Sequence, residues 1–277
     1  MTAAERWSTH VIEMRGDLVT KRYAKGDAHA LLDREWRALT LLDAHAPGLA
    51  PVPVAVDRDA DPPMVVMSRI PGVPLRGSPV DGARTAAMAK TLDALYGAVP
   101  GERLARVPVR PGHWAGLAVR LRDWHGRGPG PAAGDAVRAA LDEGMAWLDR
   151  PGRAAGPGTS GPPVFGPGDG NLANYLWDGT TSRVGVVDFE DSGRSDRPFE
   201  LAEITEHVSG WIDGGFDAAS FLDCFELTAD EWSRLRECRR LLALTWTFIL
   251  SFDDPERPRN PPGTAARQAE RLRALLG

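Results

Sequence analysis

Two short apolar segments within residues 168–190 constrain this chain more than any other stretch does. The segments Tyr175–Trp177 and Val184–Val187 are joined by a turn-forming cluster at residues 178–182 that contains Asp-Gly. Two β-type runs around such a turn predict an antiparallel β-hairpin, in which the end of one strand lies beside the start of the other. Whatever polar residues flank the hairpin are therefore expected to meet in space.

Three polar residues flank the predicted hairpin. Asn174 enters the first strand and Asp188 leaves the second, so they are expected side by side, within about one residue of register. An amide oxygen beside a carboxylate is a set of hard oxygen ligands suited to Mg²⁺. Asp169, five residues before Asn174, can then orient or deprotonate a hydroxyl that attacks a metal-bound phosphate. Since Asp and Asn are also ordinary turn residues, the same spacing alone would fit a surface turn.

This arrangement resembles the small-molecule kinases of the aminoglycoside phosphotransferase and choline kinase family, relatives of the protein kinases. The resemblance rests on Asp-x₄-Asn, the hairpin with its second Asp, and the downstream G-R-S-D-R-P-F-E-L-A segment. It implies that Asp169 is the catalytic base and that Asn174 and Asp188 are the magnesium ligands. One departure is that the chain has Pro167 before Gly168 and Asp169, where the family usually has His-Gly-Asp.

The order of the expected elements indicates an α+β fold with two lobes. Four strands come early in the chain, with one helix among them, and mostly helices follow a Pro/Gly-rich connector near residue 70. By resemblance we expect a bilobal protein-kinase-like fold, with a small β-rich N-lobe at residues 1–70 and a larger, mostly helical C-lobe at residues 71–277. The expected strands are His10–Met14, Asp17–Tyr23, Pro51–Val56 and Pro63–Met67; the expected C-lobe helices are 81–97, 114–124, 135–149, 199–211, 228–252 and one from Thr264.

A lysine and a glutamate in the N-lobe are the candidates for holding nucleotide phosphates. Lys21 lies in the second predicted strand and Glu35 in the helix that follows it. A strand lysine held by a helix glutamate positions the phosphates in kinases, and the resemblance implies this role for the pair. The alternative is that Lys21 is an edge-strand lysine and Glu35 faces solvent. Arg22, on the opposite face of the strand, is a rival for the role of Lys21.

The connector after the fourth strand resembles the nucleotide-binding hinge of the family. The resemblance implies that an adenine contacts the backbone near Met67, Ser68 and Ile70, so these side chains do not distinguish ATP from GTP. The chain has no glycine-rich phosphate loop between its first strands, where Gly16 is the single glycine. Phosphate cover would then fall to Ser8 or Thr9, or to a shortened amino-terminal segment.

Acidic residues after the hairpin are candidates for binding the acceptor. Glu190 and Asp191 follow the second hairpin strand, and the expected helix at 199–211 carries Glu203 and Glu206 on one flank. Such a group would attract a cationic substrate, for example an amino sugar or another alcohol that bears an amine. The alternative is a solvated helix face on an acidic protein. His207, in the same helix, is interpreted as an ordinary surface or hydrogen-bonded histidine.

Composition narrows the partners and the location. A formal net charge of −5 and the absence of a long basic run argue against a nucleic-acid partner. The longest apolar run, Leu241–Leu250, is too short to span a bilayer, so no membrane is expected. Two cysteines, widely spaced and without a signal sequence before them, indicate a cytoplasmic protein. The oligomeric state is not indicated.

The sequence therefore predicts a phosphotransferase that uses ATP and Mg²⁺ to phosphorylate a hydroxyl of a small molecule. The acceptor is expected to be an amino sugar, an antibiotic or another amine-bearing metabolite. The alternative is a nucleotide-binding, pseudokinase-like module that transfers no phosphate, which the missing glycine-rich loop and loop histidine favour. Asp169, Asn174 and Asp188, all present, favour the enzyme.

Overall fold

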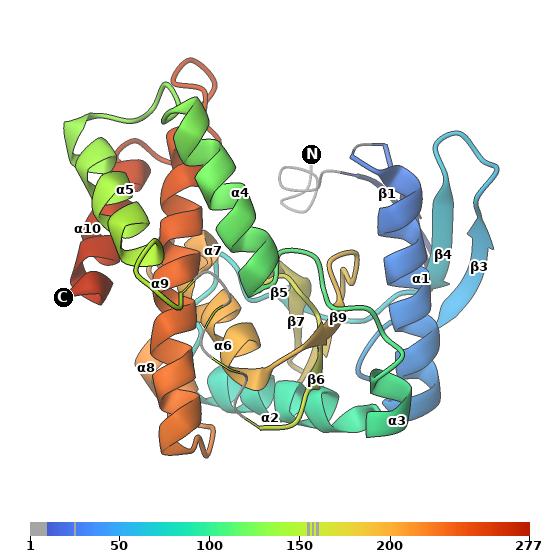
Figure 1. Cartoon of the computed structure of the whole chain (residues 1–277). Coiled ribbons are helices and arrows are strands. Elements are labelled where there is room, and N and C mark those ends of the chain that lie inside the picture. The colour runs from blue at the N-terminus through green and yellow to red at the C-terminus, as the bar shows by residue number, and fades with distance from the viewer. Residues whose placement is uncertain (1–9, 25, 154–155, 157, 159–160) are drawn as a thin grey trace.

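The computed structural model describes residues 10–24, 26–153, 156, 158 and 161–277. Its amino-terminal part is an antiparallel sheet with the strand order β1-β2-β4-β3 and one helix beside it (Figure 1). The elements are β1 (Val11–Arg15), β2 (Leu18–Arg22), α1 (Ala28–His45), β3 (Pro53–Asp57) and β4 (Met64–Ser68). All four strands lie within two residues of their predicted positions. Ser8 and Thr9, the candidates for phosphate cover, lie outside the described residues.

Local chemistry accounts for this amino-terminal part. The β1–β2 hairpin turns at Gly16 and Asp17, and Gly16 has the positive φ of 57° that such two-residue turns require. Helix α1 begins where the side chain of Asp27 accepts a hydrogen bond from the amide of Ala30, a common N-cap. The result is a small sheet with its single helix, as predicted.

The carboxyl-terminal part is mostly helical (Figure 1). Its helices are α2 (Gly82–Ala98), α3 (Gly101–Leu104), α4 (Trp114–Arg127), α5 (Asp135–Leu148), α6 (Arg197–Glu206), α7 (Val208–Trp211), α8 (Ala218–Leu222), α9 (Ala229–Ser251) and α10 (Thr264–Leu276). The predicted capping box opens α9, with Thr228 and Glu231 each accepting from the backbone of the other. The predicted α+β, bilobal arrangement is confirmed, while the border at residue 70 stays a prediction.

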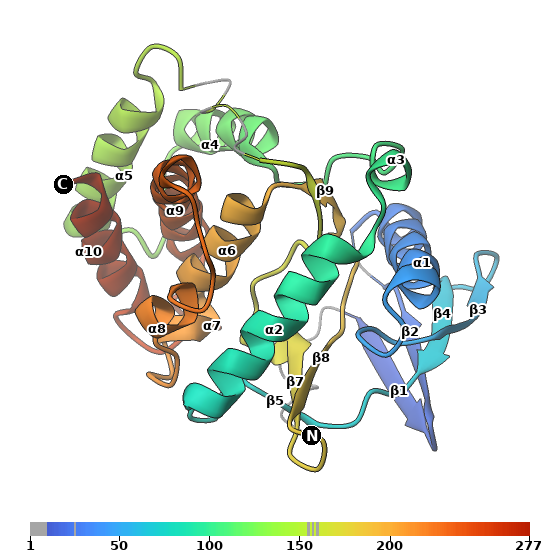
Figure 2. The ribbon, with the colours of Figure 1, turned by 90° about the horizontal axis from the view of Figure 1, so that it is seen from below.

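The carboxyl-terminal part also contains two small sheets. A three-stranded sheet has the order β5-β7-β8, with β5 (Val73–Pro74), β7 (Tyr175–Asp178) and β8 (Arg183–Val186). The pair β7–β8 is the predicted hairpin, and helix α2 packs along β8 (Figure 2). A second small sheet pairs β6 (Val164–Gly166) with β9 (Gly193–Ser195) and was not predicted, because strands of three residues leave little periodicity to read.

The predicted helix at residues 199–211 is wrong in one respect, because it breaks at His207. Helix α6 ends there, and His207 begins the short helix α7 as its N-cap, with the side chain accepting from the amide of Ser209. The apolar spacing continues through the break, so the sequence pattern does not reveal it. The new direction of the chain turns the His207 ring into the molecule, where the residue is only 6% exposed.

Candidate active site

The loop after β6 positions Asp169 through an unusual backbone at Gly168. Gly168 has a φ of 89°, and a Cβ on it would lie 2.1 Å from the carbonyl oxygen of Asp191. Only glycine combines this conformation with so close an approach. The loop is therefore pressed against the segment that follows β8, and it continues into the 3₁₀ turn η2 (Leu172–Asn174).

Asp169 is held in place by two hydrogen bonds from its own loop. Its Oδ1 accepts from the amide of Asn171 at 2.9 Å, and its Oδ2 accepts from the Asn174 side-chain amide at 2.8 Å. One third of the side-chain surface remains exposed. Burial raises the pKa of Asp169 to about 6, although both hydrogen bonds favour the charged form. The carboxylate is thus oriented, reachable and close to the basicity that a general base at neutral pH needs.

An arginine from a distant segment braces the loop at residues 167–171, which carries Asp169. Arg110, between α3 and α4, donates from Nη2 to the carbonyl oxygen of Gly168 at 2.5 Å and from Nη1 to Glu200 and Glu203 at 3.1 Å each. Glu200 in turn accepts from the amide of Gly168 at 3.2 Å. Both backbone groups of Gly168 are therefore held by one buried ion pair, in a loop that carries Pro167 in place of the family's histidine. The sequence analysis missed Arg110, because no local pattern distinguishes it among thirty arginines.

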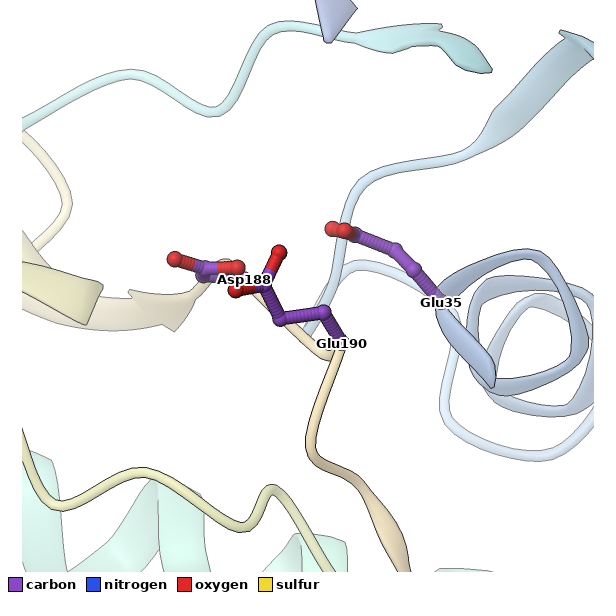
Figure 3. A group of neighbouring side chains, drawn as sticks. All are labelled: Glu35, Asp188 and Glu190. Atoms are coloured by element: carbon purple, nitrogen blue, oxygen red, sulfur yellow. The ribbon is translucent and has the colours of Figure 1, made fainter. Parts of the chain in front are cut away.

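Lys21 lies at the centre of three carboxylates. Its Nζ lies 2.6 Å from Glu35, 2.5 Å from Asp188 and 2.7 Å from Glu190. Figure 3 shows Glu35 reaching from α1 toward the two acids that follow β8. Tyr23 also donates to Glu35, from its hydroxyl at 2.5 Å. The contact of Lys21 with Glu35, implied by resemblance, is present, and Lys21 is only 5% exposed rather than an edge-strand surface residue.

Asp188 leaves the hairpin in a conformation rare for residues other than glycine. Its φ is 68°, which redirects the chain at the end of β8. Such outliers are concentrated at functional sites, where the surrounding structure holds them. Burial raises the pKa of Asp188 to about 7, against the opposing pull of Lys21. The carboxylate is thus kept in a place that disfavours its negative charge.

The hairpin register brings Asn174 opposite Val187, one residue from the expected partner. The carbonyl oxygen of Asn174 accepts from the amide of Val187 at 2.9 Å, and Asp188 follows directly. The side-chain nitrogen of Asn174 is used on Asp169, so the amide oxygen is the atom it can offer to a cation. Asn174 and Asp188 are therefore neighbours across the hairpin end, within the predicted one-residue tolerance.

The donor set suits a hard divalent cation. Carboxylate oxygens of Glu35, Asp188 and Glu190 all lie within 4.8 Å of one another. These carboxylates face the ammonium of Lys21, and Nε2 of His10 lies 2.8 Å from Glu190. A bound cation would add to the positive charge that offsets them. Oxygen ligands of this kind are those that Mg²⁺ prefers.

Two backbone amides of the predicted hinge are hydrogen-bonded within the amino-terminal sheet. The backbone amide of Ser68 donates to the carbonyl oxygen of Val52 at 2.8 Å. The backbone amide of Arg69 donates to the carbonyl oxygen of Asp17 at 2.7 Å. Met67 is buried in β4, while Ile70 packs against Gly185 of β8 and joins the two lobes. The amides of Ser68 and Arg69 are therefore already used within the sheet.

The four acids predicted to face the acceptor do not lie together, and three of them remain partly exposed. Glu190 lies 2.7 Å from Nζ of Lys21. Asp191 lies against the catalytic loop, where burial raises its pKa despite the opposing charge of Arg110. Glu203 is bonded to Arg110 and its side chain is 13% exposed.

The structure contradicts the prediction that Glu206 faces the acceptor. Its side chain is fully buried, with one oxygen 2.6 Å from Arg239 and the other 3.1 Å from Arg271. Both arginines come from the last two helices, so Glu206 joins α6 to α9 and α10 and presents nothing to a ligand. The helical spacing that grouped it with Glu203 does not show that the chain turns at His207.

None of the described helices has a stretch both long and apolar enough to cross a bilayer.

Comparison with known proteins identifies the family. A family model described as the phosphotransferase enzyme family matches residues 4–238. No protein matched in the search of curated sequences.

Several solved structures share the fold. The GDP and kanamycin complex of APH(2")-IIia superposes with a TM-score of 0.65 at 17% identity, covering 96% of this chain and 88% of that one. Choline kinase LicA from Streptococcus pneumoniae gives a TM-score of 0.61 at 14% identity, covering 96% and 89%. A thermostable mutant of APH(4)-Ia gives 0.63 at 18% identity, covering 97% and 94%.

At these identities the superpositions establish the fold, and the family model, which spans most of the chain, establishes the relationship. The chain belongs to the phosphotransferase enzyme family and is a small-molecule kinase.

Proposed function

We propose that this protein transfers the γ-phosphoryl group of ATP, with Mg²⁺, to a hydroxyl of a small amine-bearing molecule. The observation that carries the proposal is the convergence of Lys21, Glu35 and Asp188 at the hairpin end whose Asn174 holds the carboxylate of Asp169. A kinase needs these groups together, because phosphoryl transfer depends on positioning and on offsetting charge.

In this proposal the residues divide into a phosphate end and an acceptor end. Lys21, held by Glu35, binds the phosphates, and Asp188, Asn174 and Glu190 would hold the magnesium, which when bound offsets charge on the phosphates. Lys21 releases at least one of its present carboxylate partners, because its Nζ has only three hydrogens to donate. The nucleotide base lies at the hinge near Met67, Ser68 and Ile70.

Asp169 acts on the acceptor. Its carboxylate accepts a hydrogen bond from the acceptor hydroxyl and aims the oxygen at the γ-phosphorus. It takes the proton as the new O–P bond forms and the bond from that phosphorus to the bridging oxygen breaks, which releases ADP. Asn171 and Asn174 keep the carboxylate in one orientation throughout. A base whose pKa is about 6 remains largely ionised at neutral pH, so it is ready to accept that proton.

Asp191 and Glu203 are the acids that we assign to the acceptor side, and they support an amine-bearing substrate. Both lie near Asp169, and Arg110 only partly balances their charge. The fold-sharing APH(2")-IIia complex contains kanamycin, and a structure of APH(4)-Ia contains hygromycin B with AMP-PNP. One of these complexes contains GDP and the other AMP-PNP, so both ATP and GTP should be tried as phosphoryl donors.

We further propose a cytoplasmic location without a nucleic-acid partner. Both cysteines of the chain are free thiols, as expected in a reducing compartment. The net charge of −5 disfavours binding to phosphate backbones.

The test measures phosphoryl transfer from radiolabelled ATP or GTP to a panel of amino sugars and amino alcohols. Asp169→Asn keeps the shape of the side chain and removes its basicity, so turnover should fall by about a hundredfold or more with little change in nucleotide affinity. Asp43→Asn, an exposed change on α1, is the matched control. Equal turnover of Asp169→Asn and wild type would remove Asp169 from the reaction.

A further inference from the structure

His207 and Ser209 link the start of helix α7 to the catalytic loop, and nothing in the mechanism above uses them. Nε2 of His207 lies 3.5 Å from Oδ1 of Asp169. Nδ1 of the same ring lies 2.8 Å from the hydroxyl of Ser209, and that hydroxyl accepts from the amide of Leu172 at 2.9 Å. The pair therefore contacts both the carboxylate of Asp169 and the backbone three residues after it.

The hydrogen bonds assign the tautomer of the ring. The amide of Ser209 donates to Nδ1 of His207 at 3.1 Å, so Nδ1 is an acceptor and carries no proton. Burial also keeps the ring neutral, because it lowers the pKa of His207 to about 3. A neutral imidazole with a bare Nδ1 has its proton on Nε2, the atom that faces Asp169.

The ring is held where this N–H can act. Its plane is perpendicular to that of Trp246, with ring centroids 4.5 Å apart, and the residue is 6% exposed. A separation of 3.5 Å is long for a hydrogen bond, but such contacts at catalytic groups commonly shorten when substrate closes the site. A nucleophilic Ser-His-Asp arrangement is not formed, since Ser209 is 3% exposed and its hydroxyl is already used on both sides.

We propose that His207 is a positioning residue for Asp169: its neutral Nε2–H donates to the carboxylate and, with Ser209, fixes the catalytic loop for phosphoryl transfer. This inference rests on the proposed role of Asp169. A neutral N–H restrains the carboxylate without adding to the positive charges of Arg76 and Arg110, which already lie near Asp169. Asp169 thereby gains a third donor, which comes from outside its own loop.

The contact itself is tested in solution without any acceptor. The full chain is labelled with ¹⁵N-histidine, and long-range ¹H–¹⁵N spectra report the tautomer of each ring, with His207 assigned from the spectrum of His207→Asn. We expect a neutral ring protonated on Nε2 and a displaced Nε2 resonance in Asp169→Asn. A proton on Nδ1, or an Nε2 resonance that moves no more in Asp169→Asn than in the control Asp43→Asn, would overturn the proposal.

Two substitutions separate positioning from helix capping. His207→Asn keeps an oxygen that can accept from the amide of Ser209, the N-cap function, but cannot reach Asp169. His207→Gln loses the cap and keeps an N–H donor at the distance of Nε2. Capping should therefore govern the melting temperature, and the donor should govern turnover.

We expect kcat for ATP hydrolysis, and for transfer to choline or kanamycin, to fall about ten- to a hundredfold in His207→Asn, with KM for ATP nearly unchanged. His207→Gln should retain most of the turnover at a lower melting temperature. If His207→Asn matches wild type while Asp169→Asn is inactive, the inference about His207 is wrong and the role of Asp169 stands. Full activity of Asp169→Asn would instead remove the proposed function.

Discussion

Replacing Glu203 by glutamine is expected to stabilise the free protein above neutral pH. The side chain is almost buried beside Asp169 and Glu200, and Nη1 of Arg110 lies 3.1 Å from its carboxylate. Burial, with the two neighbouring acids, raises the pKa of Glu203 from its ordinary value of 4.5 to about 7, in spite of Arg110. Glutamine has the same shape and no charge to disfavour.

The sign and size of the effect follow from proton linkage. Between pH 4.5 and 7 the folded protein holds a proton on Glu203 that the unfolded chain has released. The free energy of unfolding therefore falls as pH rises, by about 1.36 kcal/mol per pH unit and about 3 kcal/mol across this window. Glu203→Gln lacks this loss, so at pH 8 it should be more stable than wild type by up to about 3 kcal/mol, and near pH 4.5 the two should be similar.

Urea unfolding of the nucleotide-free protein between pH 4.5 and 8 measures the difference. Comparing two proteins at each pH cancels the titration of groups they share. The control is Glu206→Gln in the same helix, which leaves Arg239 and Arg271 without their shared carboxylate. That change should destabilise the protein by about 1–3 kcal/mol at pH 8. A stability difference between Glu203→Gln and wild type that is constant with pH, or that favours wild type at pH 8, would refute the reasoning.

Further expectations concern ligands and the catalytic loop. Nucleotide at a hundred times its Kd in Mg²⁺ should stabilise the protein by about 2.7 kcal/mol, and the same nucleotide concentration should stabilise it less in EDTA. Asp188→Asn should erase most of that Mg²⁺-dependent difference in melting temperature, and an undiminished difference would exclude Asp188 as a ligand. Lys21→Met should slow phosphoryl transfer by orders of magnitude in the radiolabel assay, because Arg22, the other cation of β2, is bonded to Glu13 and cannot replace the proposed phosphate contact; wild-type turnover would assign the phosphates elsewhere. Gly168→Ala should lower kcat and the melting temperature together, since its Cβ would meet the backbone of Asp191, and unchanged values of both would contradict the strained loop. Glu203→Gln should raise KM for a cationic acceptor more at low salt than at high salt, whereas equal KM values would leave the acid without an acceptor role.

The sequence by itself determined the local features of this protein. The hairpin between Tyr175 and Val186 follows from two β-type runs around one Asp-Gly turn, and the helix at α9 follows from the capping box at Thr228. These elements depend on residues within about twenty positions of one another, so their signals survive in a linear reading. The family resemblance also predicted the contact of Lys21 with Glu35, which the spacing of the two residues alone left open.

Only the tertiary structure decided where the charges meet. Arg110 reaches Gly168 and Glu203 across 58 and 93 residues of chain, and no local pattern encodes such a meeting. Glu190, predicted as an acceptor residue, lies 2.7 Å from Nζ of Lys21, a contact between distant segments that no local pattern encodes.

The packing of distant segments also explains why Glu203 and Glu206 have different partners and why His207 lies near Asp169. Helical spacing placed all three on one element, but the chain changes direction at His207, and the last two helices supply arginines that enclose Glu206. Electrostatic and hydrogen-bond partners are chosen by the packing of distant segments, whereas periodicity reports only the faces of single elements. The sequence therefore indicated Asp169 and Asn174 as candidate site residues. It did not indicate Arg110 and His207, which contact the loop from distant segments.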